Sequence, residues 1–102
     1  MSRRFTVEFS EGVKKDLARL RAYDCRILLE AIETPLTHTP LVETKKRKLL
    51  RNLAPPFEAI PPIWQLRVGA FRVFYDVNEE ERRVYVRAIR RKPAHLKTEE
   101  IL

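Results

Sequence analysis

The chain has 102 residues, of which 44% are hydrophobic, and a formal net charge of +7. This length fits one compact domain, expected to span residues 1–102, and no stretch approaches the roughly 18 to 20 apolar residues that cross a membrane. Because the N-terminus also lacks an apolar signal region, we expect a soluble protein of the cytoplasm.

The first third of the chain predicts one strand and two helices. Residues 4–9 alternate between polar and apolar side chains, as in a half-buried strand. Ser10 then caps an amphipathic helix that runs to about Arg21. Asp24 offers the cap of a second helix, and Pro35 should end or kink that helix one residue earlier.

The middle of the chain is a basic segment followed by a proline-rich connection. Residues 45–53 are dense in lysine and arginine, and three leucines among them suit either a short strand or an ordered arm. Residues 54–62 contain four prolines, which lack amide donors, so this segment must be a loop or an extended connection.

A β-hairpin is predicted over residues 63–77. If Gly69 and Ala70 form a two-residue type II′ loop, which takes glycine at its first position, three apolar pairs share one face. These pairs are Val68 with Phe71, Leu66 with Val73, and Trp64 with Tyr75. Because side chains alternate along a strand, Arg67 and Arg72 then project together from the opposite face, with Gln65 beside them.

The C-terminal third predicts one more strand. After a short acidic turn, Val84, Val86 and Ala88 alternate into a strand that Pro93 ends, and residues 94–102 form a tail or a short helix. Each predicted helix has one apolar face, and a sheet is the only large partner left to cover it. We therefore predict an α+β two-layer sandwich with an N-terminal strand, a two-helix hairpin and an antiparallel meander of three to four strands.

The Arg67–Arg72 pair says more about function than any other feature. Two guanidinium groups held side by side repel each other, and no acid lies opposite either one. A rigid hairpin that holds them together is typical of an anion site, and phosphate is the commonest anion that matches the planar guanidinium fork. The alternative is that both arginines only solvate the outer face of the sheet.

The net charge is concentrated in the C-terminal half. Residues 1–43 carry seven basic and seven acidic side chains, whereas residues 44–98 carry fourteen basic side chains and five acidic ones. Such a cationic surface indicates a nucleic acid, an anionic membrane or an acidic protein as the partner, in that order of expectation. A charge that serves only solubility is the alternative.

Nothing in the sequence indicates a metal or a nucleotide cofactor. Cys25, His38 and His95 are far apart in the chain and resemble no zinc site. With only two glycines, the chain has no glycine-rich phosphate loop. The lone Cys25 cannot form an internal disulfide, which fits a reducing compartment. We expect no metal and no cofactor.

Several motifs of this chain recur together in one protein family. The hairpin string Leu66–Tyr75 has the pattern L-R-V-G-x-F-R-V-F-Y, and the ending Val84–Lys92 has the pattern V-x-V-x-x-I-x-x-K. The opening Phe5–Ser10 and the downstream Lys15–Leu17 are also typical of that family. In these motifs and in the order of its elements, nearly the whole chain resembles the RelE/ParE superfamily of toxin–antitoxin toxins.

The resemblance implies two helices on one face of the sheet and an active site on the concave opposite face. Toxins of the RelE branch cleave mRNA in the ribosomal decoding site, and those of the ParE branch poison DNA gyrase. By resemblance, Arg67 and Arg72 match positions that bind the scissile phosphate, and Lys92 matches a basic residue of the same site. Further residues expected to bind the substrate are Gln65, Lys45, Lys46, Lys48, Arg87, Arg91 and Tyr85, the last by stacking on a base.

Two positions depart from the best-known ribonuclease pattern. Gln65 stands where that pattern has a lysine, and a neutral amide cannot act as a general base. Thr98 stands nearest to the position of a C-terminal catalytic tyrosine. His95, three residues earlier, is therefore the expected acid or base, as in other toxin branches that use a C-terminal histidine.

These observations favour a metal-independent, ribosome-dependent endoribonuclease, an mRNA interferase, in which Arg67, Arg72 and Lys92 hold the phosphate and His95 moves a proton. The alternatives are a gyrase-inhibiting toxin of the ParE kind and an inactive homologue retained for antitoxin binding. Every reading implies a cognate antitoxin whose acidic segment covers the phosphate site in a heteromeric complex. The enzyme's other partners are the ribosome and mRNA, and no membrane partner is expected.

Overall fold

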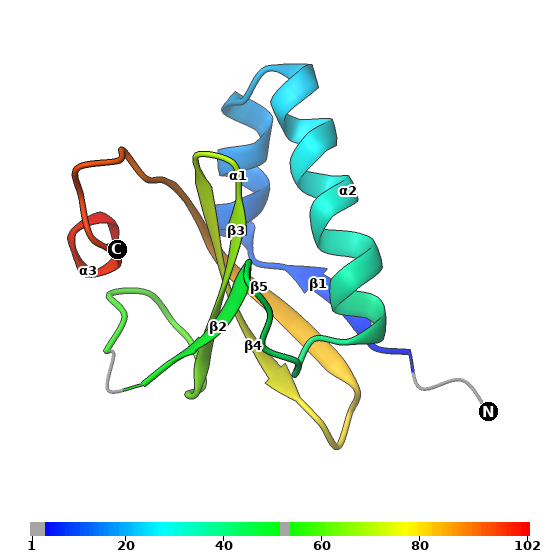
Figure 1. The fold of residues 1–102 in the computed structure, drawn as a ribbon. Coiled ribbons are helices and arrows are strands. Elements are labelled where there is room, and N and C mark those ends of the chain that lie inside the picture. The colour runs from blue at the N-terminus through cyan, green and yellow to red at the C-terminus, as the bar shows by residue number, and fades with distance from the viewer. Residues whose placement is uncertain (1–3, 52–53) are drawn as a thin grey trace.

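The computed structural model describes residues 4–51 and 54–102, which form two layers (Figure 1). The elements are β1 (Thr6–Phe9), α1 (Glu11–Arg19), α2 (Ala22–His38), β2 (Arg47–Leu50), β3 (Ile63–Val68), β4 (Phe71–Asn78), β5 (Arg83–Arg91) and α3 (Thr98–Ile101). The sheet has the strand order β1-β5-β4-β3-β2, with β1 parallel to β5 and the other pairs antiparallel. The predicted α+β fold class is confirmed.

The first helix begins as the sequence predicts, but the second does not. The Ser10 hydroxyl accepts a hydrogen bond from the Val13 amide at 3.2 Å, and α1 ends at Arg19, two residues before the predicted end. The N-cap of α2 is Arg21, which makes no side-chain cap, so the predicted Asp24 cap is wrong. Asp24 lies inside the first turn instead and pairs with Arg21 at 3.3 Å.

Pro35 does not end α2, which continues through it to His38. A proline inside a helix removes one backbone hydrogen bond, so burial must hold the final turn in place. Leu36 is fully buried, and the Thr39 amide closes the helix by donating to the Pro35 carbonyl at 2.8 Å. Of the two predicted effects of Pro35, an end or a kink, the end near residue 34 is therefore wrong, because tertiary packing outweighs the local penalty.

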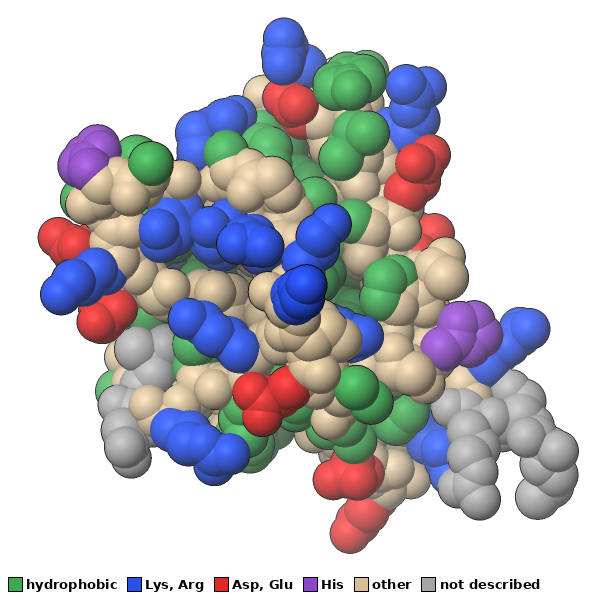
Figure 2. Space-filling model, in the orientation of Figure 1, with side chains coloured by type: hydrophobic (Ala, Val, Ile, Leu, Met, Phe, Trp, Pro, Cys, Tyr) green, Lys and Arg blue, Asp and Glu red, His purple; other side chains and the backbone are tan. Residues whose placement is uncertain are grey.

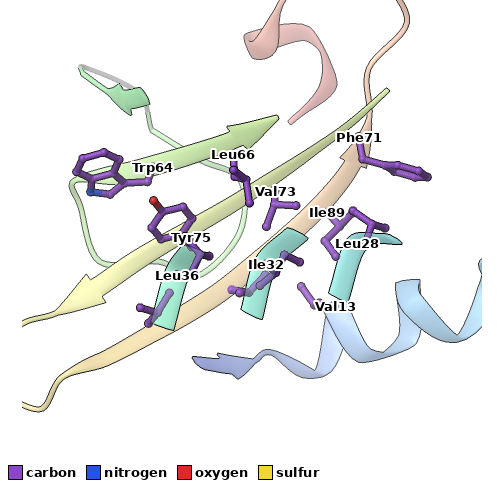
Figure 3. Close-up of a cluster of buried hydrophobic side chains, with 12 residues drawn as sticks. Val13, Leu28, Ile32, Leu36, Trp64, Leu66, Phe71, Val73, Tyr75 and Ile89 are labelled. Carbon is purple, nitrogen blue, oxygen red and sulfur yellow. The ribbon is translucent and has the colours of Figure 1, made fainter. Parts of the chain in front are cut away.

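The main core lies between the helices and the sheet (Figure 3). All three predicted hairpin pairs are present in the β3–β4 register, and the Trp64 and Tyr75 rings stack with centroids 6.1 Å apart. The buried Tyr75 hydroxyl donates to the carbonyl of Pro40, which follows α2, at 2.7 Å. The core residues are Val13, Leu28, Ile32, Leu36, Trp64, Leu66, Phe71, Val73, Tyr75, Val84, Val86 and Ile89.

A second, smaller cluster lies on the face of the sheet that α1 and α2 leave uncovered. Ile63, Phe74 and Ala88 form its buried centre, and Phe57 of the proline-rich connection packs on them. The chain end, Ile101 and Leu102, joins this cluster, so α3 lies across the sheet from α1 and α2 (Figure 1). We call this side of the sheet the open face.

A β-bulge in the β4–β5 pair changes which side chains face the helices. Phe74 pairs with Ala88 but Tyr75 pairs with Val86, so Arg87 is an extra residue in β5. Val84 and Val86 lie in the main core as expected, whereas Ala88 lies in the open-face cluster. The strand is confirmed, but its simple alternation fails at the bulge.

The basic segment forms the edge strand β2, which resolves the alternative between a strand and an ordered arm for residues 47–50. Leu53, one of its predicted apolar anchors, lies outside the described residues. Among residues 4–51 and 54–102, no helix is long and apolar enough to cross a membrane.

Candidate functional site

The β3–β4 hairpin places Arg67 and Arg72 directly opposite each other. Gly69 begins the turn with φ of 58°, and Ala70 does not share this sign, since Arg82 is the only described non-glycine residue with positive φ. A positive φ at the first loop position alone fits the predicted type II′ turn. The short turn fixes the strand register and therefore the arginine pair.

A cavity of about 240 Å³ lies at this pair on the open face. Figure 2 shows Lys and Arg side chains gathered across this face, between the C-terminal segment and the helices. We call the cavity the basic pocket. Its lining is Thr44, Lys45, Lys46, Arg47, Lys48, Gln65, Arg67, Arg72, Lys92 and Thr98.

Among residues 4–51 and 54–102, no acidic side chain lines the basic pocket, so its positive charges are not neutralised from within. The Arg72 guanidinium donates to the carbonyls of Gly69 and Phe71, each at 2.9 Å, and is thereby held at the turn. Partial burial, and then the charge of Arg67, lower the pKa of Arg72 from its usual value. Both effects disfavour the arginine's own positive charge, and a bound anion would relieve the second.

Backbone hydrogen bonds connect the other walls of the pocket to the hairpin. The Arg67 amide donates to the Lys46 carbonyl, and the Lys92 amide donates to the Ala70 carbonyl, both at 2.7 Å. The basic segment and the end of β5 are thus held beside the hairpin turn. Lys46 and Lys92 come from segments far apart in sequence, yet both lie within reach of the arginine pair.

Arg47 anchors the basic segment from the opposite side of the sheet. Its side chain is 8% exposed, and its guanidinium donates to the carbonyl and to the hydroxyl of Thr39. Arg47 pairs with Leu66 of the core, whereas the next residue, Lys48, pairs with Gln65 on the open face. The buried arginine therefore directs its neighbour Lys48 into the pocket.

Gln65 forms the floor of the basic pocket and is only 5% exposed. Its amide oxygen accepts a hydrogen bond from the Thr98 hydroxyl at 2.8 Å. The two positions that depart from the ribonuclease pattern therefore contact each other. Neither side chain transfers protons near neutral pH, so a proton-transfer group must come from outside this pair.

His95 lines a larger neighbouring cavity of about 740 Å³ and not the basic pocket itself. The two cavities share Lys48, Lys92 and Thr98, which form the boundary between them. The exposed His95 imidazole thus lies across this boundary from the arginine pair. In the described part of the chain, no group of three or more His, Cys, Asp or Glu side chains could hold a metal ion.

Three of the residues expected to bind substrate lie outside both cavities. Arg87 pairs with the buried Asp76 at 2.7 Å, and the Tyr85 ring lies 4.7 Å from the Arg87 guanidinium. Arg91 lies over the Phe71 ring at 4.5 Å. In contrast, the structure brings together Gln65, Arg67, Arg72, Lys92, Lys45, Lys46 and Lys48 in the basic pocket.

The bulge explains why Arg91 does not lie on the open face, and why the sequence analysis missed Arg90. A regular strand would place Arg91 on the open face, but the extra residue Arg87 shifts the phase. Arg90 consequently pairs with Arg72 in the β4–β5 register. The sequence signal for this shift is Ile89, which continues the apolar pattern three residues after Val86 where a regular strand would have a spacing of two.

The fold is that of RelE-like toxins. The RelBE2 toxin–antitoxin complex of Mycobacterium tuberculosis contains a similar chain, with 21% identity, 87% of this chain and 99% of that chain covered, and a TM-score of 0.69. The archaeal RelE–RelB complex of Pyrococcus horikoshii gives 20% identity, 91% and 99% coverage, and a TM-score of 0.70.

Residues 7–92 match the family model of the ParE toxin of the type II toxin–antitoxin system parDE. The chain therefore belongs to the ParE toxin family, within the RelE/ParE superfamily. It is the toxin of a toxin–antitoxin module. No curated protein sequence matches it significantly.

Proposed function

We propose that this toxin is a ribosome-dependent endoribonuclease that cleaves mRNA and blocks translation. The observation that supports this proposal is the Arg67–Arg72 pair in a basic pocket without an acidic lining. During attack by a ribose 2′-OH, negative charge grows on the scissile phosphate, and preorganised cations stabilise that charge. Arg67, Arg72 and Lys92 bind this phosphate, and Lys45, Lys46 and Lys48 bind the flanking RNA backbone.

His95 transfers a proton in the proposed reaction, since the described residues that line the pocket include no histidine and no carboxylate. It lies in the neighbouring cavity, whose boundary residues Lys48 and Lys92 also line the pocket. An imidazole exchanges protons near neutral pH, as acid–base catalysis requires. The 2′-OH is an internal nucleophile, so the reaction needs no metal-activated water.

The proposed partners are the ribosome with its mRNA and a cognate antitoxin, all in the cytoplasm. The similar chains of known structure come from RelBE2 and RelE–RelB complexes, which supports a heteromeric complex here as well. An acidic antitoxin segment that covers the basic pocket would neutralise its charge and block access of RNA.

Gyrase inhibition is the second candidate function, and the match to the ParE toxin model favours it. Inhibition through a protein surface needs no proton-transfer group, which agrees with the neutral Gln65–Thr98 contact. The Gln65–Thr98 contact also agrees with a third candidate function, that of an inactive homologue retained for antitoxin binding.

The test is to map the 5′ ends of a defined mRNA in a purified translation system with the full chain. The proposal predicts cuts at codon-phased positions, absent without ribosomes and absent with Arg67→Ala/Arg72→Ala. Arg19→Ala/Arg26→Ala, which removes the same charge from the helices, is the matched control and should cleave like the wild type. Intact mRNA with a folded wild-type chain would contradict the proposal, and a gyrase supercoiling assay would then decide between the two remaining candidates.

A further inference from the structure

Three arginines lie in one row across the three central strands, beside the β3–β4 turn. Arg67 on β3 pairs with Arg72 on β4, and Arg72 pairs in turn with Arg90 on β5. Directly paired residues share one face of a sheet, so all three side chains leave the open face. Neighbouring strands are about 4.8 Å apart, so the row is about 10 Å long. A single phosphate cannot contact both of its ends.

Among the described residues, Arg90 has one ion pair, which is long and partly exposed. Its guanidinium carbon lies 6.0 Å from the centroid of the Phe57 ring, which belongs to the open-face cluster. Its ion-pair partner is the Asp16 carboxylate on α1, at 3.7 Å. The side chains of Arg90 and Asp16 are 35% and 38% exposed, so solvent weakens this pair. Arg87, by comparison, has a buried partner at 2.7 Å and is 15% exposed. Arg90 thus retains a charge that an anion can use.

We propose that Arg90 and Arg72 form a second phosphate site, so that the open face binds two successive phosphates of one RNA strand. Arg67, Arg72 and Lys92 hold the scissile phosphate, and Arg90 holds the phosphate next to it. This inference rests on the proposed function, because both sites bind the same RNA. With two phosphate sites, the toxin binds an RNA strand of at least three nucleotides without the ribosome.

The test compares two probes that cannot be cleaved: a 2′-O-methyl dinucleotide with one phosphate and a 2′-O-methyl trinucleotide with two. Binding to the full chain is measured by calorimetry at low salt. The wild type should bind the two-phosphate probe about fivefold more tightly or better, because the second phosphate gains charge-assisted hydrogen bonds. Arg90→Ala should remove this advantage.

Arg91→Ala is the matched control, because it removes the same charge from the next residue, which faces the helix layer over Phe71. It should keep the advantage of the two-phosphate probe. If Arg90→Ala also keeps it, the second site does not exist. If Arg67→Ala/Lys92→Ala, which spares Arg72 and Arg90, binds both probes like the wild type, the proposed scissile-phosphate site fails instead.

A variant that leaves the sheet unchanged tests the same site if Arg90→Ala fails to fold. Asp16→Asn removes the carboxylate that competes for Arg90, so it should tighten binding of the two-phosphate probe and leave the one-phosphate probe unchanged. Glu11→Gln removes an equal charge from the same helix, where Glu11 contacts only Lys14 among the ion pairs of the described residues. Equal effects of the two variants on both probes would overturn the inference.

Discussion

At the scale of single residues, the proposed cleavage reaction depends on His95. The imidazole lines the cavity next to the basic pocket, and no other histidine does. His95→Ala should therefore lower the rate of mRNA cleavage about 100-fold or more while mRNA binding stays within about twofold. Single-turnover cleavage on programmed ribosomes measures the rate. His38→Ala, at the far end of α2, is the control, and wild-type cleavage by His95→Ala would exclude this role.

Tyr75 makes stability depend on pH in the alkaline range. Burial raises the pKa of its hydroxyl above the ordinary value of 10.0, although the charge of Arg47 acts against this. The unfolded chain ionises Tyr75 near its ordinary pKa and the folded chain does not. Stability is therefore full below pH 10 and falls above it, by about 1.4 kcal/mol per pH unit.

Tyr75→Phe isolates this effect. At neutral pH the variant should lose about 1 kcal/mol of unfolding free energy, because the hydrogen bond to the Pro40 carbonyl is gone. Above pH 10 the difference between wild type and variant should shrink and reverse. Urea titrations at neutral pH and above pH 10 measure the unfolding free energies. If the difference between the two proteins does not change with pH, Tyr75 ionises alike in the folded and unfolded states.

At the scale of elements, strand β5 shows what the sequence pattern could and could not predict. Alternation from Val84 onward correctly predicted a strand, and the family resemblance led us to expect Arg87 and Arg91 among the substrate-binding residues. The bulge at Arg87 reverses the alternation after that residue, so Ile89 joins the core and Arg91 lies over Phe71. The spacing of three residues between Val86 and Ile89 is the only local signal of the bulge, and the sequence analysis did not use it, so the position of Arg90 followed from the structure.

The Arg87–Asp76 pair should stabilise the bulge and the proline-rich connection together. Asp76 is 2% exposed and also accepts a hydrogen bond from the Ile60 amide at 2.9 Å. Asp76→Asn leaves a largely buried cation unpaired and should cost about 3 kcal/mol of unfolding free energy in urea. Asp24→Asn breaks the exposed pair with Arg21 and should cost at most about 1 kcal/mol. Similar losses for both variants would be contrary to this view of β5.

Substitution by alanine should have opposite effects on stability at Gly69 and at Gly12. Gly69→Ala forces a side chain into positive φ and should destabilise the fold by about 1 kcal/mol, even though a Cβ there meets nothing within 4 Å. Gly12→Ala lies in α1, where a Cβ makes only an ordinary contact, and should stabilise it by about 0.5 kcal/mol. Thermal unfolding compares the two variants, and a loss at Gly12 equal to that at Gly69 would refute the role of the turn.

At the scale of the whole molecule, local patterns and family motifs predicted the two layers, the hairpin register and the pocket's central residues. They failed where distant segments meet. Leu36 extends α2 through Pro35 by packing on the sheet, and Thr98 reaches Gln65 across more than thirty residues of chain. These contacts depend on tertiary packing, which outweighs local propensity.

The most direct measurement is an NMR titration of the arginine side-chain Nε–H groups with the one-phosphate dinucleotide probe. A phosphate bound in the basic pocket should shift the signals of Arg67 and Arg72 together and leave those of Arg87 and Arg91 unchanged, because Arg87 is already paired and Arg91 faces the helix layer. Shifts at Arg87 or Arg91 with none at Arg67 and Arg72, or no binding at all, would contradict a phosphate site on the open face.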